Sequence, residues 1–227
     1  MISLMKTTTE YAPPPKRAKR RDGLSTRGGV LEAAGRVFAE RGFAEATSKE
    51  ICERAGVNAA AVNYYFGGKE NLYEEVLVEA HRQVLSLEDL DEILLSGDAP
   101  EEKLRAFLKR MIKTAALSAE LWGIKVYLRE MASPSQFVTK AMATTVLPKA
   151  DKLRALVREI TGLPQDSPRL QRATGFTVIP CIGMIMFPET LRSMVLPGTA
   201  GDPEGMLEDM LAYVVGGLRA LGGSGRK

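Results

Sequence analysis

From residue 26 onward, apolar side chains recur at the three- and four-residue spacing of amphipathic helices, and no segment alternates convincingly with a period of two. Most of these stretches end at glycine, proline or a cluster of turn-forming residues, as helices do in globular proteins. The pattern therefore predicts an all-α fold of about nine helices. We expect them near residues 26–41, 47–55, 59–65, 69–95, 100–119, 121–132, 135–161, 167–194 and 203–221.

The composition is that of a globular protein, with 45% hydrophobic and 26% charged residues in 227, so a core can form without disulfides. Cys52 and Cys181 are far apart, which indicates neither a disulfide framework nor a metal site and favours a reducing compartment. No stretch reaches the roughly 18–20 apolar residues of a membrane span. The N-terminus also lacks the apolar core of a signal peptide. We expect a cytoplasmic protein without membrane contact.

The formal net charge is only +3, but five of the six residues at 16–21 are basic and follow three prolines. Such a run is typical of a solvated, disordered tail, and it also suits an arm that touches polyanions. Both interpretations stay open for this segment.

The sequence contains no constellation of catalytic residues. It has one histidine, His81, and lacks H-E-x-x-H, a glycine-rich phosphate loop and G-x-S-x-G. We therefore expect a protein that is not an enzyme and needs no cofactor. His81 lies in the predicted 69–95 helix, where we expect it to be packed or capped rather than to contact a ligand.

Two short predicted helices joined by a glycine-containing turn occupy SKEICERAGVNAAAVNYYF, residues 48–66. This arrangement is typical of a helix-turn-helix, whose second helix enters the DNA major groove. Thr47 and Glu50 have the spacing of a capping box at the start of the first helix. The residues placed to hold the two helices together are Ile51, Ala55, Val57 and Val62. The alternative is a helical hairpin that only packs.

Residues 24–75 resemble the DNA-binding domain of the TetR family of bacterial transcription regulators. The shared features are Phe-x-x-x-Gly-Phe at 38–43, Ile-x-x-x-Ala-Gly-Val at 51–57, and Tyr-Phe-Gly-Gly-Lys-Glu-Asn-Leu at 65–72. VYLREMASPS, residues 126–135, and NYYFGGKENLY, residues 63–73, together look most like the CecR-type subgroup, whose members answer to xenobiotics or antibiotics.

The resemblance implies three parts of the chain. These are a disordered basic arm (1–23), a helix-turn-helix DNA-binding domain (24–70) and a helical ligand-binding and dimerisation domain (71–227). It further implies a homodimer, most often a repressor, that a small-molecule ligand releases from palindromic operator DNA. The sequence leaves two alternatives open, a sequence-independent architectural DNA-binding protein and a helical adaptor that binds another protein.

The resemblance assigns Tyr64 and Lys69 to DNA and Phe66 to packing, while the start of the preceding helix meets the DNA backbone. Three consecutive alanines, 59–61, leave few groups that can read bases, so we expect appreciable readout of DNA shape, with the basic arm as a possible contact in the minor groove. The predicted DNA-binding residues are Thr47, Ser48, Lys49, Asn58, Ala59, Ala60, Asn63, Tyr64, Tyr65 and Lys69.

The last two predicted helices are the candidates for dimerisation. The 167–194 helix is apolar nearly all round between Phe176 and Phe187, so it has to be covered on all sides. The final helix carries an apolar stripe of Leu207, Met210, Leu211, Val214, Leu218 and Leu221. A purely intramolecular core is the alternative for both.

The middle helices are rich in methionine and aromatic residues, which suit an adaptable apolar pocket but are also common in ordinary cores. We expect Arg129 and Glu130 to form a structural ion pair rather than an anchor for a ligand. The predicted ligand-binding residues are Met111, Trp122, Tyr127, Phe137 and Phe176.

Overall fold

The structure, a computed structural model, describes residues 16–187, 189–199 and 201–223, apart from the side chains of residues 16–22, 24 and 189. Within these ranges it contains helices and no strand, which confirms the predicted all-α class. The helices are α1 (Lys16–Glu45), α2 (Ser48–Ala55), α3 (Ala61–Phe66), α4 (Lys69–Val84), α5 (Leu87–Leu95), α6 (Pro100–Ala116), α7 (Trp122–Ala132), α8 (Val138–Ala141), η1 (Met142–Val146), α9 (Leu147–Thr161), α10 (Pro168–Met186), α11 (Glu189–Val195), η2 (Pro197–Thr199) and α12 (Pro203–Gly223).

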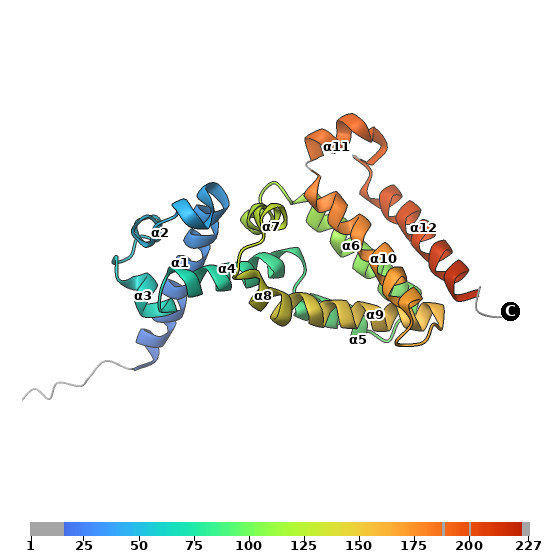
Figure 1. Cartoon of the computed structure of the whole chain (residues 1–227), viewed down its shortest axis with the longest axis horizontal. Coiled ribbons are helices and arrows are strands. Elements are labelled where there is room, and N and C mark those ends of the chain that lie inside the picture. The colour runs from blue at the N-terminus through green and yellow to red at the C-terminus, as the bar shows by residue number, and fades with distance from the viewer. Residues whose placement is uncertain (1–15, 188, 200, 224–227) are drawn as a thin grey trace, which may run out of the picture.

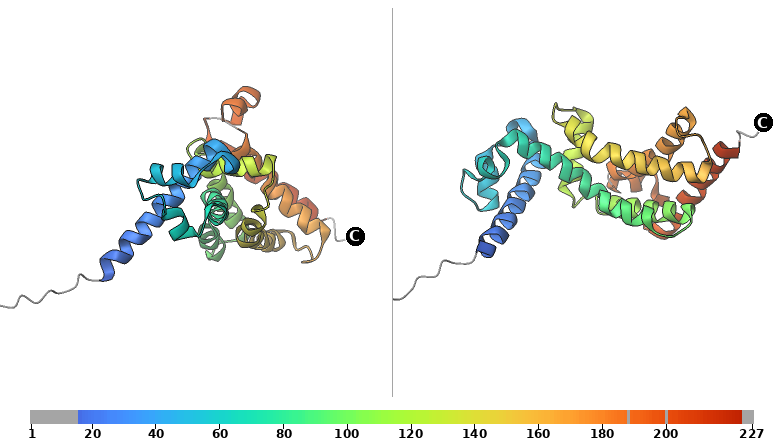
Figure 2. Two further views of the ribbon diagram at one scale, coloured as in Figure 1. Left: turned by 60° about the vertical axis from the view of Figure 1, so that its left-hand side comes forward. Right: turned by 90° about the horizontal axis from the view of Figure 1, so that it is seen from below.

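Helices α1 to α3 form one end of an elongated molecule, and α4 leads from them into the larger helical part (Figures 1 and 2). There α6 packs against α9, α10 and α12, while α7 packs against both α1 and α4. None of the helices in the described ranges combines the length and apolar character needed to cross a membrane.

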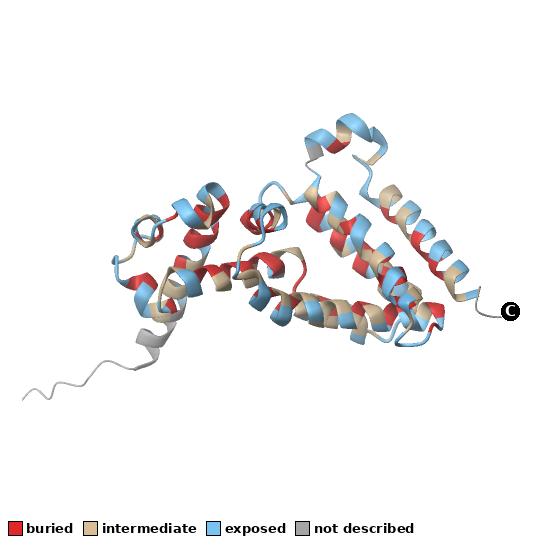
Figure 3. Cartoon of the chain, viewed as in Figure 1, coloured by how far each residue is buried: buried red, intermediate tan, exposed pale blue. Residues whose placement is uncertain are grey.

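The buried side chains form two hydrophobic cores. One joins α1, α2 and α3 to the first three turns of α4 and continues into α7 through Trp122 and Val126. The other lies among α5, α6, α9, α10 and α12, whose facing sides are buried (Figure 3). Helix α4 contributes to the first core up to Ala80 and borders the second with Val84. The packing is therefore continuous across the predicted division at residue 70.

The predicted 69–95 helix is in fact two helices. Helix α4 ends at Val84, and Leu85 has the extended backbone of a C-cap (φ −159°, ψ 119°). The hydroxyl of Ser86 then accepts a hydrogen bond from the Asp89 backbone N–H at 2.9 Å and begins α5. The capping bond at Ser86 stabilises the start of a new helix more than continuation of the old one.

Helix α1 differs from the prediction at both ends. It begins at Lys16 rather than near Thr26, so residues 16–23 of the predicted arm are helical; residues 1–15 lie outside the described ranges. The expected stop at Gly42 is a kink, because Gly42 takes a left-handed φ of 77° and the helix resumes as far as Glu45.

Proline accounts for two further departures from the predicted helices. The 135–161 segment widens into a π turn at Met142–Val146, before Pro148, which has no N–H to donate to the preceding turn. The 167–194 segment separates into α10 and α11, and Phe187, which precedes a proline in the sequence, has extended backbone.

Helix α7 is attached to α1 by a close contact and by hydrogen bonds. The Trp122 indole N–H donates to Glu32 at 2.8 Å, and Arg129 donates to the Ala39 and Glu40 carbonyls at 3.2 and 2.9 Å. The Trp122 ring lies so close to Gly35 that a Cβ there would be 2.5 Å from three ring carbons. Gly35 is therefore required by the approach of the two helices. The expected ion pair between Arg129 and Glu130 is replaced by separate bonds, since Glu130 bonds Tyr73 and Ser135.

This contact predicts opposite effects of two identical substitutions in α1. Gly29→Ala, at an exposed position with nothing within 4 Å, should raise the free energy of unfolding by about 0.5–1 kcal/mol through helix propensity. Gly35→Ala should lower it by about 1–3 kcal/mol because the methyl group collides with Trp122. Urea unfolding followed by the fluorescence of Trp122, the only tryptophan, measures both. Equal stabilisation by the two substitutions would show that the helices separate freely.

Candidate DNA-binding surface and effector cavity

Helices α2 and α3 pack through the residues expected to hold them together. Ile51 and Val62 are fully buried, and Ala55 and Val57 pack against the same core. Gly56 ends α2 in the left-handed conformation (φ 66°), which turns the chain towards α3. The opposite side of α3 and its leading turn are exposed, and they carry Asn58, Ala59, Ala60, Asn63 and Tyr64. The arrangement is that of a helix-turn-helix whose second helix packs on one side and is exposed on the other.

The two tyrosines at the end of α3 have different surroundings. Tyr64 is 80% exposed, whereas Tyr65 packs partly against the core and meets the Tyr64 ring edge-on at 4.8 Å between centroids. Phe66 is buried beneath the guanidinium group of Arg27, which lies 4.5 Å from its ring centre. The expected packing role of Phe66 is confirmed. Tyr64 is therefore the more exposed of the two tyrosines.

Lys69 makes contacts within the protein that the sequence did not indicate. Its ammonium group donates to the carbonyls of Phe43 at 3.0 Å and Ala46 at 2.9 Å, and it lies 4.4 Å from the Phe43 ring centre. Lys69 thus fixes the end of α1 to the start of α4. Gly67 and Gly68 lead into α4 with positive φ angles of 75° and 144°, so this turn needs glycine for its backbone as well as for its lack of side chains.

The other predicted DNA-binding residues stand at the entry to α2 and α3. The Thr47 hydroxyl accepts from the Glu50 N–H at 3.1 Å, as expected of an N-cap. The Glu50 carboxylate, expected to complete a capping box, is bonded instead by Arg41 and Arg54 at 2.8 and 3.4 Å. Ser48 is half-buried, and exposed Lys49 lies 3.8 Å from Glu53.

Asn58 has a structural role in the turn before α3. Its side-chain oxygen accepts from the Ala60 N–H at 2.9 Å. Helix α3 itself begins at Ala61, two residues later than predicted, so Ala59 and Ala60 belong to this turn. One lone pair of the Asn58 oxygen is therefore used within the turn, and the side chain keeps its NH₂ donors and a second lone pair.

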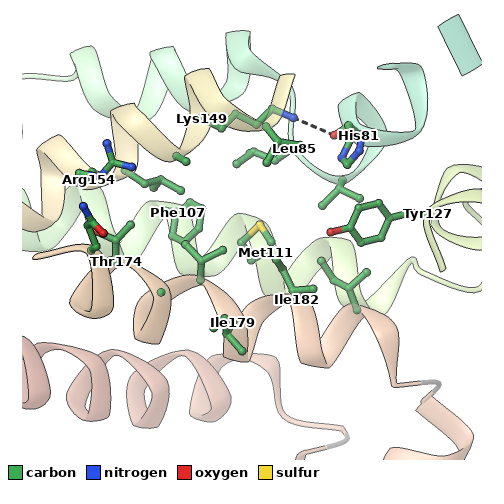
Figure 4. Close-up of a pocket in the computed structure, with 18 residues that line it drawn as sticks. His81, Leu85, Phe107, Met111, Tyr127, Lys149, Arg154, Thr174, Ile179 and Ile182 are labelled. Atoms are coloured by element: carbon green, nitrogen blue, oxygen red, sulfur yellow. Dashed lines mark hydrogen bonds between the residues drawn. The ribbon is translucent and has the colours of Figure 1, made fainter. Parts of the chain in front are cut away.

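A cavity of about 380 Å³ lies between α4, α6, α7, α9 and α10. Its wall is mainly aliphatic, with Phe107 and Met111 from α6 and a series of branched side chains from α9 and α10 (Figure 4). The size and lining are those of pockets that bind small organic molecules. The polar groups on the wall come from His81, Tyr127, Lys149, Arg154, Gln171 and Thr174.

Of the five residues predicted to bind a ligand, only Met111 and Tyr127 line this cavity. Trp122 faces α1, and Phe137 packs against the rings of Phe43 and Tyr73 in the first core. Phe176 is 61% exposed on the outer side of α10. Residue type alone does not reveal on which side of the fold a ring lies.

His81, not expected to contact a ligand, is buried and also lines the cavity. Its ring meets that of Tyr127 edge-on, with 4.9 Å between centroids. Burial, with the Lys149 ammonium nearby, lowers the pKa of His81 from 6.5 to about 4, so the imidazole is neutral near pH 7. His81 and Tyr127 also line a smaller cavity bordered by Glu130 and Met142, and so stand between the two spaces.

The outer face of α10 and α12 exposes large apolar side chains. Phe176 and Ile179 are 61% and 66% exposed on α10, and Tyr213 is 78% exposed on α12. Phe176 and Tyr213 also line a groove to which Gly216 and Gly217 contribute. The predicted apolar stripe of α12 packs mainly into the second core within the chain, and three of its members, Val214, Leu218 and Leu221, also line this groove.

Two family models match the chain. Residues 30–76 match the model described as "Bacterial regulatory proteins, tetR family", and residues 100–215 match "HTH-type transcriptional dual regulator CecR, C-terminal domain". The second match alone covers just over half of the chain. The chain belongs to the TetR family. The predicted family and subgroup are therefore confirmed, and members of this family are helix-turn-helix transcription regulators.

Individual relatives of this TetR-family chain are distant. The "Probable HTH-type transcriptional regulator YttP" of Bacillus subtilis is 23% identical over 136 residues, which make up 60% of this chain and 65% of YttP, under two thirds of that relative. Among solved structures, the fatty acid degradation regulator FadR from Bacillus halodurans has a TM-score of 0.62 at 21% identity, covering 85% of this chain and 99% of FadR.

NalD, the secondary repressor of the MexAB-OprM multidrug efflux pump in Pseudomonas aeruginosa, has a TM-score of 0.61 at 20% identity, covering 86% of this chain and 96% of NalD. At these identities the likeness to FadR and NalD shows that the TetR-family fold is shared.

The surroundings of Tyr64 and Lys69 predict different consequences of their substitution. Tyr64→Phe should leave the free energy of unfolding unchanged and weaken DNA binding about five- to tenfold, the effect of one lost hydrogen bond. Lys69→Met should lower the free energy of unfolding by about 1–3 kcal/mol because two carbonyls lose a charged donor. Urea unfolding and fluorescence anisotropy with a duplex selected from a random pool measure the two effects. If Tyr64→Phe bound DNA as tightly as wild type, the Tyr64 hydroxyl would not contact DNA.

The neutral, buried imidazole of His81 predicts a loss of stability in mild acid. Between about pH 6.5 and 4 the unfolded chain binds a proton at His81 that the folded chain does not, so the free energy of unfolding falls as the pH falls. At pH 5 the loss relative to pH 7.5 should be about 2 kcal/mol. In urea unfolding, the free energy of unfolding of His81→Gln should fall by about 2 kcal/mol less than that of wild type between pH 7.5 and pH 5. The same pH dependence in both proteins would place its source elsewhere.

Proposed function

We propose that the chain is a homodimeric transcription repressor that binds a palindromic operator and leaves it when a small molecule occupies the cavity. The observation that carries this proposal is the second helix of the helix-turn-helix. It is fixed by a buried side, while Asn63, Tyr64 and the turn at Asn58–Ala60 face outward. An exposed face of this kind, held rigidly by a core, suits entry into a major groove.

The proposed dimer uses the outer face of α10 and α12. Phe176, Ile179 and Tyr213 leave an apolar surface in water, and the glycines at 216 and 217 allow another helix to approach closely. A two-fold interface uses the same surface of both copies, which suits two helices lying side by side. Two copies joined here would carry two recognition helices and read two inverted half-sites.

The proposed effector acts through α4, which begins beside the recognition helix and ends at the cavity. A ligand weakens DNA binding only if it binds the off-DNA conformation more tightly, and operator and ligand then weaken each other equally. A regulatory role follows from the family, and repression is the activity named for NalD. For this chain, repression and release by a ligand are part of the proposal.

The proposal is tested by selecting bound sequences from a random duplex pool at physiological salt, with wild type and two variants. We expect wild type to enrich a palindrome of two half-sites. Tyr213→Glu, which places a charge on the proposed dimer face, should be monomeric in sedimentation and enrich at most a single half-site. Leu95→Glu, at an equally exposed apolar position on α5, should behave as wild type.

Two results would contradict the proposal. Failure of folded wild type to enrich any sequence would favour the architectural or adaptor alternatives. The alanines at 59–61 keep the architectural alternative open. DNA binding with a steep salt dependence and no sequence preference would identify the architectural protein. If the Tyr213→Glu protein remained dimeric and still selected a palindrome, the dimer interface would lie on another face.

A further inference from the structure

The wall of the cavity that His81, Tyr127 and Lys149 line carries only positively charged side chains. Among the residues that line it, Lys149 and Arg154 are cationic, His81 is neutral near pH 7, and none is an aspartate or glutamate. The rest of the wall is mainly aliphatic, so little else there compensates a positive charge. A cavity with this lining favours an anion over a cation or a zwitterion.

Lys149 is the cation with the weakest compensation. In the part of the chain that the structure describes, no carboxylate lies within ion-pair distance of its ammonium group, which donates only to the His81 carbonyl at 3.1 Å (Figure 4). Burial lowers the pKa of Lys149 from 10.5 to about 8, against the opposing influence of the more distant Glu88 and Asp89. An anion that enters the cavity would stabilise the charged form of this buried ammonium group.

Arg154 is partly compensated, because its Nη1 donates to Asp151 at 2.7 Å, although its buried Nε has no hydrogen-bond partner among the described residues. Lys149, which has no carboxylate partner, is therefore the stronger candidate for pairing with an anion. Tyr127 adds a neutral hydrogen-bond donor to the same wall. Its hydroxyl points into the cavity (Figure 4), and among the described residues no hydrogen bond engages it. The ammonium of Lys149 and the hydroxyl of Tyr127 thus stand on the same side of the cavity, near His81.

We propose that the cavity binds an apolar molecule bearing one carboxylate, and that this carboxylate pairs with Lys149 and accepts a hydrogen bond from Tyr127. The inference rests on the proposed function, in which this cavity is the effector site. The aliphatic wall formed by α9 and α10 receives the apolar body. The structure thereby assigns a chemical class to the effector.

The same contact supplies a way for the ligand to act on α4. The His81 carbonyl, in the last turn of α4, accepts from Lys149 and from the Leu85 N–H at 3.3 Å. A carboxylate that takes the ammonium withdraws one of these two donors from the end of the helix. Lys149 is then both the anchor of the ligand and the group whose bond to α4 the ligand changes.

The test uses n-alkanoates from hexanoate to dodecanoate, each paired with its primary amide, in calorimetric titrations of the full chain. Each pair keeps the apolar body and differs in charge. We expect the best carboxylate to bind roughly tenfold or more tightly than its amide, since charge-assisted hydrogen bonds are about twice as strong as neutral ones. Lys149→Met should abolish this preference and keep the affinity for the amide.

Lys152→Met is the matched control on the same helix. Lys152 pairs with Asp91 outside the cavity wall, so this variant makes the same change of charge and should keep the preference for carboxylate. Tyr127→Phe should reduce the preference partially. Circular dichroism verifies that each variant is folded.

Three results would overturn the inference: no alkanoate binds, amides bind as tightly as carboxylates, or the preference survives Lys149→Met. A preference lost in Arg154→Met but kept in Lys149→Met would also contradict the assignment. These outcomes are separate from failure of the proposed function, which DNA selection without any probe measures. If the chain selects a palindrome but does not bind alkanoates, only the inference about the effector is contradicted.

The role of Lys149 in regulation has its own readout. With the selected duplex, the best alkanoate should lower the DNA affinity of wild type and of Lys152→Met. It should leave that of Lys149→Met unchanged, even at concentrations that saturate its remaining binding. Equal loss of DNA affinity in Lys149→Met would show that the ligand acts on α4 by another contact.

Discussion

The buried hydrogen bond between Tyr73 and Glu130 joins the two parts of the molecule. The Tyr73 hydroxyl donates to one carboxylate oxygen at 2.7 Å, and the other oxygen accepts from the Ser135 N–H and hydroxyl at 2.9 and 3.0 Å. Burial and the neighbouring carboxylate both raise the pKa of Tyr73, so it stays a donor. Removing one partner would leave a buried polar group unsatisfied. This bond therefore fixes α7 against α4 and so fixes the position of the DNA-binding end relative to the cavity.

Because α4 is held at both ends by lysines, it is the element through which the two sites can influence each other. Lys69 bonds the end of α1 at one end, and Lys149 bonds the His81 carbonyl at the other. Both bonds use backbone carbonyls, so they depend on where the helix ends lie rather than on the side chains there. A displacement of the whole helix along its axis would therefore alter both contacts. Such a coupled element is what a ligand must bias if it is to alter DNA binding.

The sequence predicted features that depend on neighbouring residues better than features that depend on distant ones. Thr47 was recognisable as an N-cap, and the inward and outward residues of the helix-turn-helix follow from helical spacing. Ser86 and Asp89 carry a local capping signal, but the apolar spacing continues through them and favours one long helix. By contrast, Trp122 and Phe137 enter the first core only because α7 and the segment after it fold back onto α1 and α4. The spacing of apolar residues within those segments does not indicate that Trp122 and Phe137 pack against α1 and α4.

The cavity shows why a binding site of this kind is hard to find in one sequence. Its wall combines short pieces of five helices, and each piece looks like ordinary core when taken alone. Lys149 is conspicuous only after folding, when its ammonium group lies in a mainly aliphatic wall with no carboxylate within ion-pair distance among the described residues. Ile179 lines the cavity and is also 66% exposed on the outer face of α10. The helix that forms the wall is thus also the helix of the proposed dimer, so a ligand that displaces it acts on the spacing between the two DNA-binding ends as well as on α4.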